Sequence, residues 1–456
     1  MGERYEEGLA LENKIEKKEM GKYYTPEDVA LVMAKTLLPI THDDVICDVC
    51  CGVGNLILPL LDILSEDIRN NIPIYLYDID TVALDICVYT IKKLYGDQCA
   101  SNIHHHYGDF LENNITLPHN SVVISNPPYG KISTILDSWT DSPVIADSKD
   151  FYSAIMDKIL AQSKKAVIIT PHSFMGSDKF FSLRERMNNY TGYIWSFDNV
   201  PGNIFNGRKH GIFNTNNVNS VRAAITVKTE NTPKGFQIGP YIRFSSGERA
   251  SIVSYNYLNK LQLSDYQIIS KEHLYYYRYL KETEQLVENW LSQDSTLGEY
   301  LTSISDYPIT VPNTCRYYTV GALKPLKRTG KNIVYAKNLD AFCIVYGWLN
   351  SSFCYYYHRM CNGGITYPIT LLKNMPVIKL NTDQIKQLKN IIKEMIASEN
   401  QYVSYKKNAG VLQENIKFPE EYRNRLNQIF CEAINIKTPI DAFTAIHANC
   451  SLEEED

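Results

Sequence analysis

The sequence lacks long hydrophobic runs, and this absence excludes a typical membrane-spanning helix. No apolar stretch among its 456 residues approaches the roughly 20 residues that a helix needs to cross a bilayer. The first residues, MGERYEEGLALENKIEKKEMG, are too charged for a signal peptide or a transit peptide. We therefore expect a cytoplasmic protein without a membrane partner.

The cysteines lack any regular spacing. Their number is odd, at 11, which fits a reducing cytosol better than a disulfide framework. Cys47 and Cys50 have no second pair at zinc-binding spacing. His104, His105 and His106 would alternate between the two faces of a strand, so they could not easily share one ion. We expect no metal site.

Neither sign of charge dominates the composition. With 44% hydrophobic and 21% charged residues the chain is typical of a globular protein, and its length suggests two or three domains. A net charge of −5 and a pI of about 6.1 argue against a nucleic-acid coat protein, although an enzyme acting on DNA needs only a local basic surface. One segment, 316–337, contains no acidic residue, and its basic residues are Arg316, Lys324, Lys327, Arg328, Lys331 and Lys337.

Strand-like and helix-like segments alternate through the first half of the chain. This alternation predicts an α/β fold, in which helices cover both faces of a parallel sheet. Beyond about residue 245 the alternation is lost and tyrosines become dense, so we expect two domains, 1–245 and 246–456. The expected strands are 44–49, 72–80, 104–111, 165–171 and 220–229, with a fourth in chain order within 121–130. The expected helices are 26–38, 56–64, 82–94, 151–163, 383–400 and 419–434.

Glycines and acids follow the first three expected strands. Asp48 precedes a loop containing Gly52 and Gly54, whose missing side chains let backbone amides approach a ligand. The loop has no Lys-Ser or Lys-Thr pair, so a nucleoside triphosphate is not expected. Asp78 is placed to accept hydrogen bonds from a ribose, and Asp109 with Phe110 suits an adenine. Each acid alone could cap a helix, but together they predict a pocket for an adenosine with a charged tail.

The fourth expected strand ends in the sequence SNPPYG. Two prolines end a strand because neither has an N–H to donate. Asn126 and Pro127 could hold two carbonyl acceptors in fixed directions around one amino group, while Tyr129 stacks on the ring that carries it. In isolation, Pro127-Pro128 would more simply be a β-turn. Beside an adenosine pocket, it predicts preorganised activation of an amine.

These motifs resemble those of the gamma-class N6-adenine DNA methyltransferases of restriction–modification systems. The resemblance covers the first half and rests on GKYYTPEDVA, DVCCGVG, YDID, GDF and NPPY. It implies a Rossmann-like S-adenosylmethionine methyltransferase domain with a mixed central sheet at 1–245. Asn126, Pro127, Pro128 and Tyr129 would be catalytic, with Tyr129 and Phe205 stacking on the flipped base, although Phe213 competes with Phe205. The residues implied to bind cofactor are Tyr24, Thr25, Pro26, Asp48, Cys50, Gly52, Gly54, Asp78, Asp109, Phe110 and Asn126, and Asp150, Phe151 and Tyr152 stand where relatives touch the cofactor's adenine.

The second half is similar, more distantly, to target-recognition domains through GWLNSSFCYYYHRM and the segment after it. The resemblance implies a mixed α+β domain at 246–456 that binds double-stranded DNA. From the composition of the basic segment 316–337 we expect Arg316, Lys324, Lys327 and Arg328 to contact phosphates. The resemblance also implies a monomer that modifies without cleaving, and leaves open a separately encoded restriction endonuclease. N4-cytosine methylation, methylation of RNA or of a protein glutamine, and a catalytically inactive DNA-binding module remain alternatives.

Overall fold

The protein divides into two compact units, and the boundary along the chain lies between Tyr277 and Arg278. The computed structural model describes residues 25–198, 202–205, 221–230, 234–244, 247–261, 263, 268–269, 274–314, 321–328, 330–361, 367–408, 411–439 and 443. Three residues singled out from the sequence, Tyr24, Arg316 and Phe213, lie outside these ranges.

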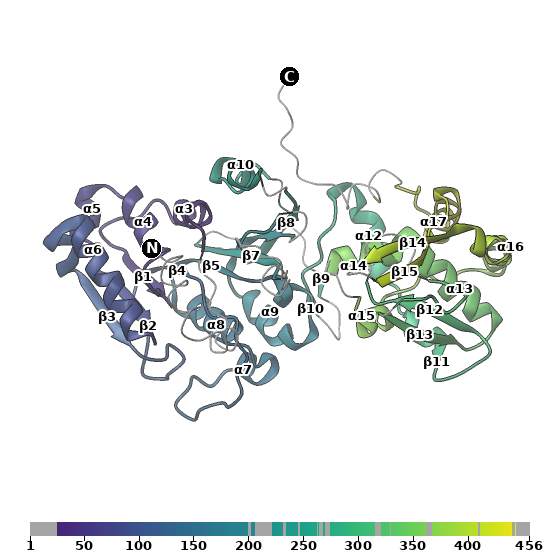
Figure 1. Ribbon diagram of the computed structural model, residues 1–456, viewed down its shortest axis with the longest axis horizontal. Coiled ribbons are helices and arrows are strands. Elements are labelled where there is room, and N and C mark those ends of the chain that lie inside the picture. Colours follow the sequence, from purple (N-terminus) through teal and green to yellow (C-terminus); the bar gives the residue numbers. More distant parts are fainter. Residues whose placement is uncertain are drawn as a thin grey trace, which may run out of the picture. The chain divides into compact units, whose positions relative to one another are not determined.

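The first unit is built on an eight-stranded sheet with the order β3-β2-β1-β4-β5-β7-β6-β8 (Figure 1). Strands β1 to β5 run parallel, whereas β7 is antiparallel to both of its neighbours. The expected α/β fold with a mixed, Rossmann-like sheet is confirmed. The strands are β1 (Val45–Val49), β2 (Ile74–Asp78), β3 (Ile103–Tyr107), β4 (Ser121–Ser125), β5 (Lys165–Pro171), β6 (Thr191–Phe197), β7 (Ala223–Thr229) and β8 (Gly235–Ile242).

Helices cover both faces of this sheet, because alternate residues of the central strands are apolar on either side. Ile46 packs in the core cluster beneath α3, α4 and α6, while Cys47 packs in the opposite cluster with α8 and α9. The helices of the unit are α3 (Glu27–Thr36), α4 (Ile57–Ile63), α5 (Glu66–Asn71), α6 (Thr81–Ser101), α7 (Pro143–Ser148), α8 (Phe151–Gln162), α9 (Phe181–Met187), α10 (Arg249–Ile252) and α11 (Tyr255–Leu258).

Two expected elements differ in length. The helix expected at 82–94 starts at Thr81, where Asp80 caps it by accepting from the Ala83 amide, and it runs on to Ser101 across a kink at Gly96. The third strand ends at Tyr107, so Asp109 and Phe110 lie in the loop that follows it.

The segment after residue 245 packs on the first unit, so the boundary falls later than the sequence suggested. Arg249 of α10 donates to the Asp28 carboxylate of α3 at 2.9 Å. The Tyr276 amide donates to the Met175 carbonyl, and the Tyr275 hydroxyl donates to Asp178. The change in sequence rhythm near 245 marks the end of the β–α alternation, whereas the packing continues to Tyr277. Two short strands lie in this segment, β9 (Ile268–Ile269) and β10 (Leu274–Tyr275).

The second unit combines helices with two small antiparallel sheets, as the α+β expectation required. Strands β11 (Leu301–Thr302), β13 (Lys331–Ala336) and β12 (Pro308–Pro312) form one sheet, and β14 (Val403–Asn408) pairs with β15 (Val411–Ile416) as a hairpin. The helices are α12 (Glu284–Leu291), α13 (Leu339–Asn350), α14 (Ser352–Cys361), α15 (Ile369–Lys373), α16 (Thr382–Ser398) and α17 (Glu420–Ala433).

The tyrosine run of α14 belongs to the core of this unit. Tyr355, Tyr356 and Tyr357 are all buried. Trp290 packs edge-on against Phe353 with ring centroids 4.9 Å apart. The tyrosines of this helix therefore build the interior of the second unit. Among the described helices, none is long and apolar enough to cross a membrane.

Candidate active site

A cavity of about 310 Å³ lies where the carboxyl ends of β1, β2, β3 and β4 meet. The chain builds β2 and β3 on one side of β1 and then places β4 on the other side. This reversal opens a crevice between β1 and β4, which is where open α/β sheets bind ligands. Predicted residues that line the cavity are Thr25, Cys50, Gly52, Asp78, Asp109, Phe110, Asn126, Pro127 and Pro128.

The loop after β1 turns sharply beneath the cavity. Cys50, Gly52 and Gly54 all have positive φ, at 62°, 52° and 94°. A side chain at Gly54 would bring its Cβ within 2.8 Å of the Cys87 sulfur, so Gly54 serves the close packing of loop and helix rather than lining the cavity. The turn leaves the backbone of Gly52 at the cavity wall.

Asp78, the last residue of β2, ties this loop to the second strand. Its Oδ2 accepts from the Gly52 amide at 2.7 Å, and its Oδ1 accepts from the Asp80 amide at 2.8 Å. A carboxylate accepts hydrogen bonds from backbone amides and from ribose hydroxyls alike. Asp78 therefore both shapes the loop and faces the cavity.

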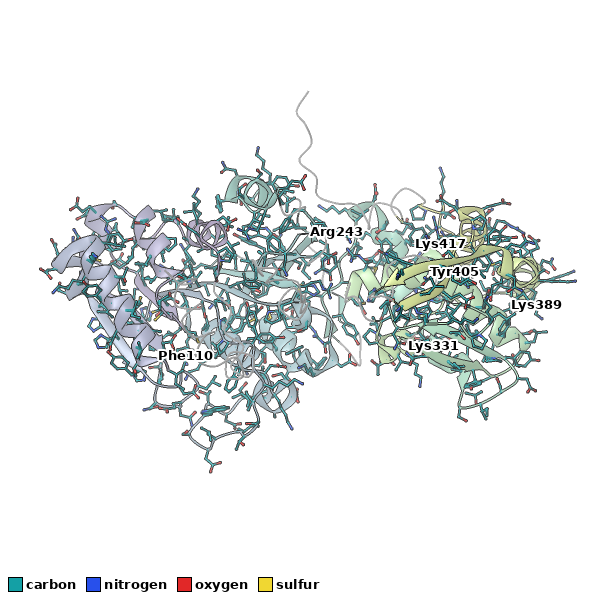
Figure 2. The ribbon with its side chains drawn as sticks, viewed as in Figure 1. Phe110, Arg243, Lys331, Lys389, Tyr405 and Lys417 are labelled. Atoms are coloured by element: carbon teal, nitrogen blue, oxygen red, sulfur yellow. The ribbon has the colours of Figure 1, made fainter. Side chains whose placement is uncertain are left out.

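Asp109 and Phe110 form the opposite wall. Asp109 accepts from the Leu111 amide at 2.9 Å, and Phe110, labelled in Figure 2, packs edge-on against Tyr77 with centroids 5.4 Å apart. Behind them Lys158 of α8 donates to the carbonyls of Phe110 and Glu112, each at 2.7 Å. Lys158 was not singled out from the sequence, because a lysine inside an amphipathic helix carries no local signal.

Asp48 lies in the sheet behind the cavity rather than on its surface. The residue is fully buried, and this burial, with the negative charge of Asp78, raises the pKa of its carboxyl well above the usual value. The amide of Ile57 acts in the other direction. Neither carboxyl oxygen has a partner at ordinary hydrogen-bond geometry among the described residues. The expected contact between Asp48 and the charged tail of the cofactor stays a prediction. It would have to be made through the loop that follows β1.

Asn126 is held at the cavity by Thr25, which lies two residues before α3. Its Nδ2 donates to the Thr25 hydroxyl at 3.0 Å. The neighbouring Ser125 hydroxyl donates to the Val49 carbonyl at 2.6 Å, which fixes the end of β4 against β1. With its nitrogen directed to Thr25, the amide presents its carbonyl oxygen from a fixed position. Pro26 itself does not line the cavity.

Tyr129 and Phe205 lie together beyond the elbow. Their rings meet edge to face at 6.0 Å between centroids, and Tyr129 also meets Tyr152 edge to face at 6.3 Å. The Tyr129 hydroxyl donates to the Ile169 carbonyl at 3.4 Å. Phe205 is only 4% exposed. A base could therefore stack between Tyr129 and Phe205 only if the two rings part.

The basic segment is largely engaged within the second unit. Lys324 donates to the Glu414 carboxylate at 2.9 Å. Arg328 donates to Gly330, Asn415 and Thr314, and burial lowers the pKa of its guanidinium. Lys327 has an exposed side chain. Of the basic residues predicted to contact phosphate and described here, Lys327 is the one most open to solvent.

Several residues lining the cavity were not predicted as cofactor ligands from motifs. Apolar side chains and short loop residues carry no individual signal, and only the fold brings them to this edge. They are Cys51, Asn55, Leu56, Tyr77, Ile79, Asp80, Ala83 and Ile155, while Phe151 lies at the cavity as the resemblance implied. Within the described ranges, no group of three His, Cys, Asp or Glu side chains is arranged to hold a metal ion.

Comparison with known proteins found matches for the part of the chain that forms this cavity. Residues 1–210 match the family model described as N-6 DNA Methylase. Residues 1–210 are less than half of the 456-residue chain, so the similarity to this family concerns its first part. The Type II methyltransferase M.VspI of Vibrio sp. (strain 343) is 31% identical to the chain over 191 residues, which are 40% of this chain and 43% of that protein. The match thus spans less than half of the length of this relative.

Two of the solved structures to which the chain is similar contain DNA. A chain of the DrdV–DNA complex matches 68% of this chain and 37% of its own length, with 17% identity and a TM-score of 0.47. The ATP-dependent Type ISP restriction-modification enzyme LlaBIII bound to DNA matches 87% of this chain and 42% of its own length, with 13% identity and a TM-score of 0.48.

The similarity of residues 1–210 to the N-6 DNA methylase family implies S-adenosylmethionine as the cofactor. The cavity suits this molecule. It offers Asp78 for ribose hydroxyls, Asp109 for an exocyclic amine, and the apolar side chains of Phe110 and Ile155 for a flat base. Thr25 and Asn126 line the same cavity, where the methyl donor would meet its acceptor.

Proposed function

We propose that the protein transfers a methyl group from S-adenosylmethionine to the N6 amino group of adenine in a specific sequence of double-stranded DNA. The proposal rests above all on Asn126, whose amide is oriented by Thr25 at the wall of the cavity. The similarity of residues 1–210 to the N-6 DNA methylase family supports it. The similarity to M.VspI, a Type II methyltransferase, gives further support.

In this proposal, the elbow activates the target amine by holding both of its hydrogens. The Asn126 side-chain oxygen and the Pro127 carbonyl each accept one N–H of the amino group, which draws the nitrogen lone pair out of conjugation. When bound, S-adenosylmethionine supplies an electrophilic methyl group. After transfer, the extra proton on nitrogen leaves along one of these two hydrogen bonds toward solvent. Both acceptors are uncharged, so positioning and electrostatics supply the rate enhancement.

The target base must leave the DNA helix, because its amino group is inaccessible within the stacked duplex. Unstacking costs a few kcal/mol, which stacking on Tyr129 partly offsets. Phe205 would turn aside to admit the base, since it now meets Tyr129 edge to face. Thr25, Pro127 and Pro128 would then form the rigid floor of the acceptor site.

Transfer of a labelled methyl group into separate samples of duplex DNA, RNA and bacterial protein tests this proposal. We expect label in DNA, and N6-methyladenine after digestion to nucleosides. N4-methylcytosine in the digest would favour the cytosine alternative, and label in RNA or protein would overturn the assignment. Asn126→Ala should abolish transfer, while cofactor affinity, measured by calorimetry, stays within a few-fold of wild type.

A further inference from the structure

The strands β14 and β15 of the second unit pair as a hairpin (Figure 1). Its side chains are packed or half-buried at the root, at 403–404 and 415–416, and most are exposed in the outer half, at 405–407 and 411–412. Val403 pairs with Ile416 at the root, and Ile416 packs with Ala322 and Leu326 in a small core. Toward the turn, Lys407 pairs with Leu412, and both side chains are exposed. The hairpin is therefore packed against the second unit at its root, whereas its side chains are exposed toward the turn.

Charged groups fix the root. The Glu414 carboxylate is buried and accepts from the Lys324 ammonium and the Lys327 amide, each at 2.9 Å. The Lys327 amide and the Lys324 ammonium keep the pKa of Glu414 below its usual value. Arg328 donates to the Asn415 side chain at 2.8 Å. The basic segment thus holds the root of the hairpin.

The outer half exposes large apolar side chains between lysines. Tyr405, labelled in Figure 2, is 61% exposed, and Leu412 is 60% exposed. Lys406 and Lys407 lie in the same strand with exposed side chains. A two-stranded ribbon has no face on which to bury such residues by itself, so apolar groups gathered there indicate contact with another molecule.

The charges of the hairpin favour a polyanion as that molecule. From Tyr402 to Lys417, Glu414 is the single acidic residue in the sequence, and it is neutralised at the root. Lys406, Lys407 and Lys417 are exposed. Lysines around apolar side chains suit a nucleic-acid groove, where ammonium groups meet phosphates and apolar groups meet sugars and base edges.

We propose that the β14–β15 hairpin inserts into the major groove of double-stranded DNA. This groove is wide enough to admit a two-stranded ribbon. Lys406 and Lys407 contact phosphates, while Tyr405 and Leu412 make the apolar contacts inside the groove. The inference rests on the proposed function for its choice of DNA over another partner, and it assigns the contact to the hairpin rather than to the basic segment that holds its root.

Salt dependence of binding by the full chain tests the lysines. Fluorescence anisotropy of a labelled mixed-sequence duplex would be recorded between about 50 and 200 mM salt. Loss of two phosphate contacts in Lys406→Ala/Lys407→Ala should lower the slope of log affinity against log salt by roughly 1.8. The control Lys386→Ala/Lys393→Ala removes the same charge from exposed positions of α16 and should leave the slope as in wild type.

Tyr405 and Leu412 should affect DNA affinity in a different way from the lysines. Tyr405→Ala/Leu412→Ala should weaken binding at every salt concentration, by tenfold or more, without changing the slope. Thermal unfolding followed by circular dichroism would show that each variant is folded. If Lys406→Ala/Lys407→Ala were unfolded, Lys406→Gln/Lys407→Gln would take its place.

Unchanged binding by both hairpin variants would overturn the inference while leaving the proposed methylation intact, since methyl transfer by wild type is measured separately. A wild-type protein that binds duplex DNA through the hairpin but labels RNA would overturn the proposed function alone. Preference for a structured RNA over duplex DNA in competition, lost in the hairpin variants, would overturn the choice of DNA.

Discussion

Asn126 and Thr25 lie 101 positions apart in the chain, yet the Asn126 side-chain nitrogen donates to the Thr25 hydroxyl at 3.0 Å. An amide is planar, so this one hydrogen bond sets the direction of the carbonyl oxygen on the other side of the group. Thr25 is therefore a positioning residue for the proposed acceptor site, in addition to its place in the cavity wall.

Loss of the Thr25 hydroxyl should slow methyl transfer more than it weakens cofactor binding. One neutral hydrogen bond contributes about 0.5–1.5 kcal/mol, which corresponds to roughly a 2- to 13-fold fall in kcat for Thr25→Val. Thr25→Ser keeps the hydroxyl and should restore most of the rate. Single-turnover transfer and calorimetric cofactor affinity would be measured side by side. A fall in affinity that accounts for the whole rate defect would contradict the positioning role.

Asp78 should control cofactor affinity through both the loop and the ribose. In Asp78→Asn the side chain keeps one acceptor oxygen but loses its charge, so the hydrogen bonds from Gly52 and a ribose hydroxyl are weakened. Hydrogen bonds to a charged group contribute about 1.5–3 kcal/mol, so we expect affinity for S-adenosylmethionine to fall roughly 10- to 150-fold. Asp85→Asn on the exposed side of α6 is a charge-matched control. An Asp78→Asn protein with wild-type affinity would exclude the ribose assignment.

Lys158 should give the protein a characteristic pH dependence of stability. Burial lowers the pKa of its ammonium to about 8, against the opposing charges of Asp109 and Glu112. The unfolded chain keeps this proton up to about pH 10.4, so unfolding takes up a proton between these two pKa values. Through this group, the free energy of unfolding rises with pH from about 8 to about 10.

The measurement is urea denaturation of wild type and Lys158→Met at pH 8 and at pH 9.5. The difference in free energy of unfolding between the two proteins should grow in favour of wild type at the higher pH, because other titrating groups cancel. Lys158→Met also removes the donor to the carbonyls of Phe110 and Glu112 and should weaken cofactor binding. An equal pH slope in the two proteins would rule out a depressed pKa for Lys158.

Tyr129 should act through its ring rather than its hydroxyl. Stacking of a base on an aromatic ring contributes about 1–3 kcal/mol, so Tyr129→Ala should lower kcat/KM on duplex DNA roughly 5- to 150-fold. The hydroxyl donates a long hydrogen bond to the Ile169 carbonyl at 3.4 Å, and stacking does not use this group, so Tyr129→Phe should stay close to wild type. Fluorescence of 2-aminopurine at the target position would report base extrusion, and a Phe variant as defective as Ala would contradict stacking.

Arg328 should matter for stability of the second unit, in contrast to Lys327. Arg328→Ala leaves the acceptors of Gly330, Asn415 and Thr314 without their donor, so we expect a loss of about 1–3 kcal/mol in the free energy of unfolding. Lys327→Ala removes an exposed side chain and should be nearly neutral. Guanidinium denaturation compares them, and equal stability of the two variants would show that the Arg328 contacts contribute nothing.

The sequence alone predicts the strands β1 to β5 and β7 and the residues at their ends, whereas β6 and β8 were not among the expected strands. Strand-like segments ending in Asp78, near Asp109 and at Asn126 fixed which residues would meet, because parallel strands bring their carboxyl ends to one edge whatever the loops do. The NPPY elbow is readable for the same reason, since two prolines end a strand in any context.

The tertiary structure was needed to show which side chains orient the site. It was also needed to show which basic residues bind partners within the second unit. Lys158 behind Phe110, and Thr25 beside Asn126, depend on packing between segments far apart in the chain, which no local pattern encodes. Tyr355, Tyr356 and Tyr357 were ambiguous in sequence because tyrosine suits both cores and surfaces, and the helix packing buried them. Lys324 and Arg328 appear free in sequence, but Glu414 and Asn415 bind them once the β14–β15 hairpin folds over the basic segment.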